Sequence, residues 1–239
     1  AVPSGAVVTA AVDAGTTRVV KQGLGTLILD RASTHPGGTV VEAGTLVLRD
    51  PASVGSGFLR VFPGATVVLD VGTREIPLNG LDLAATGTLD LAIGSVLITD
   101  GTFLDNSGII ALIPRGLEKL SGIMSSSIEP GSFREIGYRV LPDGSLKVGY
   151  SAVGDANMDG SVNLQDLIAL DAGGKFGTAA TDAGWWQGDF NHDGVVNIVD
   201  MIAMDASGLY GAGSYLPVAP QTAAGSISSH QLAWAAIAS

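Results

Sequence analysis

Across residues 1–150, short runs alternate apolar with polar or small positions, and Gly, Asp, Asn or Pro separates the runs. A two-residue period of this kind predicts β-strands that bury one face. No 3.6-residue helical period competes with it over that span. The predicted strands occupy residues 25–30, 44–49, 66–71, 87–92 and 95–99. The pattern therefore predicts a mainly β region.

The predicted strands recur at a nearly constant interval. Gly-Thr-Leu begins at residues 25, 44 and 87, and the related Gly-Ala-Thr-Val begins at residue 64. A period near 20 residues is typical of a β-solenoid, or β-helix, in which each coil buries its apolar face against the next coil. A β-sandwich with regular turns also spaces its strands evenly. We expect a β-solenoid for residues 1–150, with a sandwich-like domain as the alternative.

Residues 23–48 read Gly-Leu-Gly-Thr-Leu-Ile-Leu-Asp-Arg-Ala-Ser-Thr-His-Pro-Gly-Gly-Thr-Val-Val-Glu-Ala-Gly-Thr-Leu-Val-Leu. This stretch resembles the autotransporter-associated β-strand repeat, which joins two Gly-Thr-Leu strands through a small polar turn ending in Gly-Gly-Thr. His35 stands where that family commonly has Tyr, and later coils are degenerate to about residue 110. The resemblance implies a right-handed β-solenoid on a secreted bacterial protein, located outside the cell or at its surface.

A different pattern begins after residue 150. Residues 155–166 and 189–200 both follow D-x-N-x-D-G-x-V-N-x-x-D, and each is preceded by glycine. Calcium binds six to eight hard oxygen ligands, and a twelve-residue loop supplies them at alternate positions around a sharp turn at a glycine. A single loop of this composition is also compatible with a solvated cluster of Asx turns. Two copies in register predict two Ca²⁺ sites.

The expected ligands follow from the loop positions, with backbone carbonyls at position 7 and Asp at position 12 in place of the usual Glu. They are Asp155, Asn157, Asp159, Ser161, Asn163 and Asp166 in the first loop, and Asp189, Asn191, Asp193, Val195, Asn197 and Asp200 in the second. His192 occupies position 4 of the second loop, where we expect its side chain to point outward.

Each loop is expected to lead into a short helix with one apolar stripe at i, i+3 and i+4. The stripes are Leu164, Leu167 and Ile168 in the first unit and Ile198, Met201 and Ile202 in the second. The pair of units resembles a type I dockerin, an EF-hand-like module that binds cohesin domains, and the resemblance covers residues 151–212. Dockerins usually carry hydroxyl residues at loop positions 10 and 11. Here those positions hold Leu164-Gln165 and Ile198-Val199.

Charge marks the boundary between the two regions. The chain carries a net charge of −11, and residues 151–210 hold nine acidic residues against Lys175 alone. We therefore expect a domain at 1–150, an acidic calcium-binding domain at 151–212 and an uncharged tail at 213–239. An acidic surface opposes nucleic-acid binding. No apolar run reaches the length of a transmembrane helix, and Ala1 is compatible with a new end left by signal peptidase.

The sequence offers few candidates for catalysis. Cysteine is absent, and neither a Gly-x-Ser-x-Gly elbow nor a phosphate-binding loop occurs. Asp82 and Asp90 could form the acidic pair of a polysaccharide-cleaving β-helix, but positions at strand ends explain them better. Trp185-Trp186 is compatible with sugar stacking, but an aromatic pair beside small helices is more often core.

These observations predict a secreted, non-enzymatic structural protein that calcium stabilises and that self-assembles into a fibre or surface layer. Unpaired strand edges at solenoid ends, sparse surface charge and the apolar segments 6–12 and 231–238 motivate self-association. The alternative is a module that docks the β-domain onto a cohesin-bearing scaffold. A third hypothesis is a carbohydrate-active β-helix enzyme.

Overall fold

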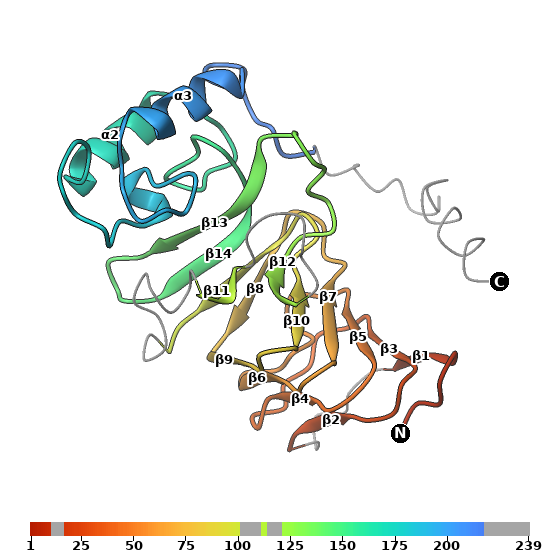
Figure 1. The fold of residues 1–239 in the computed structure, drawn as a ribbon. Coiled ribbons are helices and arrows are strands. Elements are labelled where there is room, and N and C mark those ends of the chain that lie inside the picture. The colour runs from red at the N-terminus through yellow and green to blue at the C-terminus, as the bar shows by residue number, and fades with distance from the viewer. Residues whose placement is uncertain (11–16, 101–110, 114–120, 218–239) are drawn as a thin grey trace.

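The computed structural model describes residues 1–10, 17–100, 111–113 and 121–217. Over these residues the chain is mainly β, and its N-terminal part is a β-solenoid of about four turns. A smaller module with short helices follows it, at the end of the solenoid away from the N-terminus (Figure 1). The prediction of a solenoid rather than a sandwich is confirmed.

The largest sheet contains the strands that the Gly-Thr-Leu repeat predicts. All of its strands are parallel, in the order β1 (Val7–Ala10), β3 (Thr26–Leu29), β5 (Thr45–Leu48), β7 (Thr66–Leu69), β10 (Thr88–Asp90) and β12 (Gly122–Met124). Successive coils thus lie directly above one another. A sandwich would need antiparallel neighbours.

The register of this sheet explains the repeat. The threonines of the motif pair across the strands, and so do the residues that follow them: Leu27, Leu46, Val67 and Leu89. Because side chains alternate across a strand, this second row points into the solenoid. Leu46, Val67 and Leu89 are fully buried there. Each coil therefore completes the core of its neighbour, as the periodicity predicts.

A second parallel sheet closes the opposite side of each coil. Its order is β2 (Val19–Lys21), β4 (Thr39–Val41), β6 (Phe58–Val61) and β9 (Gly80–Leu83). No strand was predicted for these segments. They are as short as the strands of the first sheet but lack the Gly-Thr-Leu motif that marks β3, β5 and β10.

Glycine permits the tight stacking of coils at the start of β5. Gly44 has a φ of 70°, in the left-handed region that side chains disfavour. A Cβ atom there would lie 2.5–2.7 Å from backbone atoms of Gly23, Leu24 and Gly25 in the preceding coil. The glycine of the motif therefore leaves room for the backbone of the preceding coil.

The third sheet joins the solenoid to the C-terminal module. In it, β8 (Glu75–Leu78) and β11 (Ser95–Ile98) are parallel, and the hairpin of β13 (Arg134–Val140) and β14 (Leu146–Ala152) adds antiparallel to β11. The turn at Pro142-Asp143-Gly144 connects the hairpin, and the Asp143 carboxylate accepts hydrogen bonds from Ser145 N and Oγ at 3.0 and 2.6 Å. The strand pairing thus continues beyond residue 150.

The C-terminal module contains α2 (Leu164–Gly173), the 3₁₀ turn η2 (Trp185–Gln187) and α3 (Ile198–Ala206). Each helix begins at the end of its loop, as the sequence predicts. The apolar stripes of the two helices face solvent in part, because Leu164, Ile168, Ile198 and Ile202 are each more than half exposed. Leu170 provides the buried contact of α2 instead. In the described part of the chain, no helix is long and apolar enough to cross a membrane.

Candidate metal-binding loops

The two predicted loops have the same backbone conformation. Position 4 is left-handed in both, with φ of 58° at Met158 and 59° at His192. Position 6 is a glycine in both, with φ of 90° at Gly160 and 86° at Gly194. Non-glycine residues rarely adopt positive φ. The shared geometry therefore shows that the sequence repeat is a structural repeat.

The carboxylate at position 1 lies at the centre of each loop. Asp155 Oδ1 accepts a hydrogen bond from Asp159 N at 3.1 Å, and its Oδ2 accepts one from Gly160 N at 3.0 Å. Asp189 repeats both bonds at 3.0 and 2.9 Å. Asp155 and Asp189 are both fully buried. Each loop thus wraps its backbone amides around one carboxylate.

Positions 3 and 5 are linked in the same way in both loops. Asn157 Oδ1 accepts from Asp159 N at 2.8 Å, while Asn157 Nδ2 donates to Asp159 Oδ2 at 3.0 Å. Asn191 and Asp193 make the same pair of bonds, both at 2.9 Å. Amide and carboxylate oxygens of the predicted ligand set therefore lie close together along each loop.

Position 12 connects each loop to its helix. Asp166 Oδ2 accepts from Asn163 N at 2.8 Å, and Asn163 caps α2 through Gln165 N at 2.8 Å. This arrangement is a capping box, with Asp in the place of the usual Glu. Asp166 Oδ1 also accepts from Asn157 N at 3.1 Å. Position 12 is thereby held against the start of the loop.

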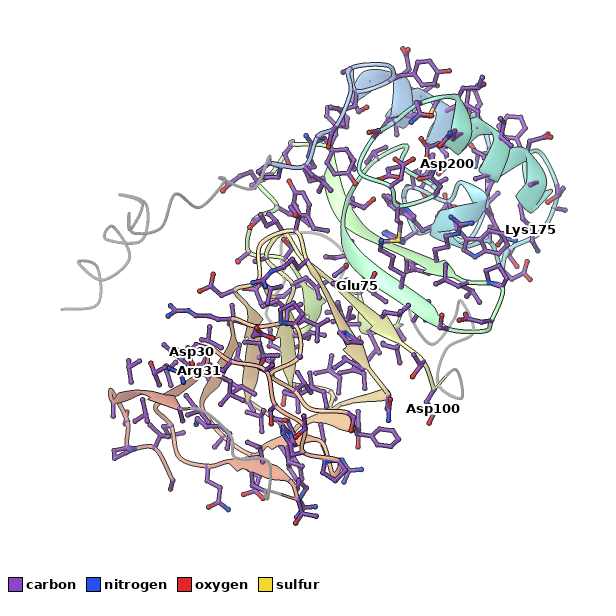
Figure 2. All side chains as sticks on the ribbon, turned by 180° about the vertical axis from the view of Figure 1, so that it is seen from behind. Asp30, Arg31, Glu75, Asp100, Lys175 and Asp200 are labelled. Atoms are coloured by element: carbon purple, nitrogen blue, oxygen red, sulfur yellow. The ribbon has the colours of Figure 1, made fainter. Side chains whose placement is uncertain are left out.

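The second loop repeats this capping box before α3. Asp200 Oδ2 accepts from Asn197 N at 2.9 Å, and its Oδ1 accepts from Phe190 N at 3.0 Å. Figure 2 shows Asp200 within the helical module. In both units, therefore, the carboxylate at position 12 turns toward the beginning of its own loop.

Burial of the loop carboxylates has an electrostatic cost, because it disfavours their ionised form. It raises the pKa of the Asp155 carboxyl to about 6, against hydrogen bonds from Tyr215 and Gly160 that favour the ionised form. Burial likewise raises the pKa of Asp189 to about 6, and it raises the pKa of Asp166 and of Asp200. None of the ion pairs among the described residues involves a carboxylate of either loop. A cation would relieve this cost.

The predicted ligand side chains of the two loops do not form a closed metal-binding cage. Among the described residues, no group of three or more His, Cys, Asp or Glu side chains is placed to hold a metal ion. The loop carboxylates are hydrogen-bonded to backbone amides instead. The donor set nevertheless fits calcium, because it consists of carboxylate, amide and backbone oxygens at alternate positions.

Contacts outside the motif distinguish the two loops. Tyr215 Oη donates to Asp155 Oδ2 at 2.5 Å, and Tyr215 N donates to Gly160 O at 3.0 Å. In the second loop, His192 is buried and stacks on Tyr138 of β13, with ring centroids 6.1 Å apart. The prediction that His192 points outward is therefore wrong. Its left-handed backbone turns the side chain toward the hairpin rather than toward solvent.

Basic side chains of the hairpin reach the first loop. Arg139 Nη1 donates to Asn157 O at 3.2 Å, and Lys147 Nζ donates to Met158 O at 3.3 Å. Lys147 Nζ also lies 3.6 Å from Glu75 Oε2 of β8, and Figure 2 shows Glu75 near the junction of solenoid and module. The motif gave no signal for these contacts, because both basic residues belong to the β region.

The other candidate sites do not assemble. Asp82 lies on β9 and pairs with Arg60 at 2.6 Å. Asp90 lies on β10, in a different sheet, and accepts from Ala92 N and Ser126 N, both at 2.9 Å. The acidic pair proposed for a carbohydrate-active enzyme is therefore absent from the described structure. Trp185 is fully buried, which confirms the prediction that it belongs to the core.

Comparison with known proteins supports the N-terminal assignment. Residues 19–48 match the family model of the passenger-associated transport repeat. These residues extend from β2 to β5 and include the stretch whose motif resembles the autotransporter-associated repeat. Neither the curated proteins nor the solved structures gave a match to the chain.

The class of protein follows from the repeat and the fold together. A passenger-type repeat within a β-solenoid fits a passenger-like structural protein, and such a repeat suggests a surface or secreted location. The match does not extend to residues 151–212. The resemblance to dockerins therefore rests on the two loops alone.

Proposed function

We propose that the chain is a secreted, non-enzymatic structural protein of the cell surface or extracellular space, and that two calcium ions stabilise its C-terminal module. The observation that carries the calcium proposal is the duplication of one loop geometry around the buried carboxylates of Asp155 and Asp189. A surface location supports it, because extracellular modules commonly use calcium in loops of this kind.

Calcium would act by offsetting the electrostatic free energy that is lost when the loop carboxylates are buried. Each loop buries the carboxylate at position 1, and this burial disfavours the ionised form more than repulsion from the neighbouring aspartates does. A ligand that binds only the folded form stabilises it by about 2.7 kcal/mol at a hundredfold excess over Kd. The module would then be rigid in calcium and loose in chelator.

Calorimetric titration tests this proposal. The full chain is expected to bind two calcium ions, and Asp159→Ala and Asp193→Ala are each expected to bind one, because each removes the position-5 carboxylate of its loop. Asp171→Ala is the matched control, since Asp171 is exposed on α2 outside both loops. Fewer than two ions on the unaltered chain would refute the ligand assignment.

We further propose that the protein self-associates through the edge of its largest sheet, building toward a fibre or surface layer. The edge strand β1 carries Val7, whose side chain is 65% exposed, and no charged residue. Free strand edges without charge are prone to pair with another chain. A second copy would supply a strand whose main chain makes the hydrogen bonds.

A lysine on this edge tests self-association. Val7→Lys is expected to leave the solenoid folded and to lower the mass measured by sedimentation velocity at high concentration, because a charge on an edge opposes pairing. Thr45→Lys places the same charge on the interior strand β5 and serves as the control. A full-length protein that stays monomeric at high concentration with calcium would eliminate self-association.

A second candidate function is docking onto another protein, and the helix surface favours it. Five apolar side chains of the two helices are more than half exposed: the equivalent pairs Leu164/Ile198 and Ile168/Ile202, and Val199. Exposed apolar patches of this kind often mark protein interfaces. A cohesin-like domain is the partner that the resemblance to dockerins implies.

A further inference from the structure

One side chain touches both loops. Trp185 begins η2, and its indole Nε1 donates to the backbone oxygen of Asp155, position 1 of the first loop, at 2.8 Å. Its ring stacks on His192 with centroids 5.3 Å apart, and it meets Phe190 edge-on at 5.2 Å. Phe190 and His192 occupy positions 2 and 4 of the second loop. Trp185 therefore bridges two sites that are 34 residues apart in sequence.

The surroundings are shaped to hold this indole in place. Trp185 is fully buried. A Cβ atom at Gly137 of β13 would lie 2.8 Å from Trp185 Nε1, so the strand carries no side chain where the indole passes. Asp155 N is itself bonded to Ala152 O at 2.9 Å. The hydrogen bond from Trp185 thus fixes the peptide that follows the central carboxylate of the first loop.

We propose that Trp185 is a positioning residue that couples the two calcium sites, an inference that rests on the proposed calcium binding. Calcium in the second loop fixes Phe190 and His192, and these rings hold the indole. The indole in turn holds the carbonyl of Asp155, so the first loop is already ordered when its ion arrives. Coupling between two binding sites is reciprocal, so occupancy of the first loop strengthens the second equally.

A core residue without this role would behave differently. Loss of packing alone would weaken the fold and both sites together, without changing how one site depends on the other. Coupling is measured by comparing each site with its neighbour intact and with its neighbour removed. Asp159→Ala and Asp193→Ala provide the two single-site forms.

The experiment combines these single-site forms with a conservative change at the tryptophan. Trp185→Phe keeps an aromatic ring against the second loop and removes the donor to Asp155. Trp186→Phe is the matched control, because the Trp186 indole nitrogen is buried without a hydrogen-bond partner among the described residues. Calorimetry gives the calcium affinities, and native mass spectrometry counts the ions bound to each form.

The expected result is that each site of the unaltered chain binds calcium about five- to tenfold more tightly than it does when its neighbour is removed, which is the size of one hydrogen bond. Trp185→Phe is expected to abolish this dependence of each site's calcium affinity on its neighbour, and to lower the affinity of the first site by a similar factor. Trp186→Phe is expected to keep the dependence. Two bound ions with coupling unchanged in Trp185→Phe would overturn the inference and leave calcium binding intact.

A second variant decides the question if Trp185→Phe does not fold. His192→Leu leaves the bond from Trp185 to Asp155 and removes the stacked ring of the second loop. The inference is supported if His192→Leu abolishes the coupling but leaves the calcium affinity of the first site, measured without the second site, unchanged. Retained coupling in His192→Leu would overturn it. A chain that binds no calcium at all would refute the proposed function itself.

Discussion

The leucines of the solenoid and Asp155 are held by different kinds of contact. The leucines of the Gly-Thr-Leu motif lie where the alternating pattern places them, because a strand offers only two faces. The neighbours of Asp155 were not predictable. Trp185 and Tyr215 reach it from 30 and 60 residues away, and no spacing rule connects them with the loop.

His35 is another residue whose surroundings only the structure reveals. It is fully buried in the solenoid, with Nδ1 2.6 Å from Ser33 Oγ and Nε2 3.0 Å from Thr39 Oγ1. Thr39 Oγ1 donates to Val54 O at 3.1 Å, so this bonding pattern assigns the proton of the neutral ring to Nε2. Nδ1 then accepts from Ser33. The site is built for the neutral imidazole.

This site predicts a pH dependence of the solenoid. Burial lowers the pKa of His35 from its ordinary 6.5. Below pH 6.5 the unfolded chain binds a proton that the folded chain does not, so stability is complete above that pH and falls as the pH decreases, by at most about 1.4 kcal/mol per pH unit. Urea unfolding at pH 7.5 and 5.5 is expected to show a larger loss for the unaltered chain than for His35→Gln. Equal losses would contradict the assignment.

Among the strands and helices, a repeated sequence motif decided which elements could be predicted. Four-residue strands that share a motif were located because the motif recurs in register, whereas β2, β4, β6 and β9 share no motif. The helices were located from the loops that precede them and from the i, i+3 and i+4 spacing of their apolar residues. The burial of the carboxylates Asp166 and Asp200 on the inner sides of these helices is visible only in the structure.

The exposed apolar faces of α2 and α3 lead to a prediction about docking. The double variant Ile168→Ser with Ile202→Ser is expected to change the urea midpoint little, because both side chains are more than half exposed. If these faces dock a partner, the variant is expected to lose binding to an immobilised type I cohesin domain. The Asp171→Ala variant is the control for a change elsewhere on α2. Cohesin binding that survives the double change, or is absent from the unaltered chain, would remove the docking hypothesis.

For the whole molecule, the structure connects two parts that the charge pattern separates. The step in charge near residue 150 predicted a boundary there, yet β14 continues to Ala152 and the β13–β14 hairpin contacts both loops. Lys147 illustrates the connection, because it approaches Glu75 of the solenoid and the carbonyl of Met158 in the first loop. A long-range contact of this kind has no local sequence signature. We therefore expect calcium to act on the hairpin as well as on the loops.

Hydrogen exchange measured by mass spectrometry, in calcium and in chelator, tests the central claim most directly. Calcium is expected to slow exchange in residues 154–166 and 188–200 and in the hairpin at 134–152, and to leave β3, β5 and β7 unchanged, because their core contains no calcium ligand. Equal exchange of both loops in calcium and chelator would contradict the account.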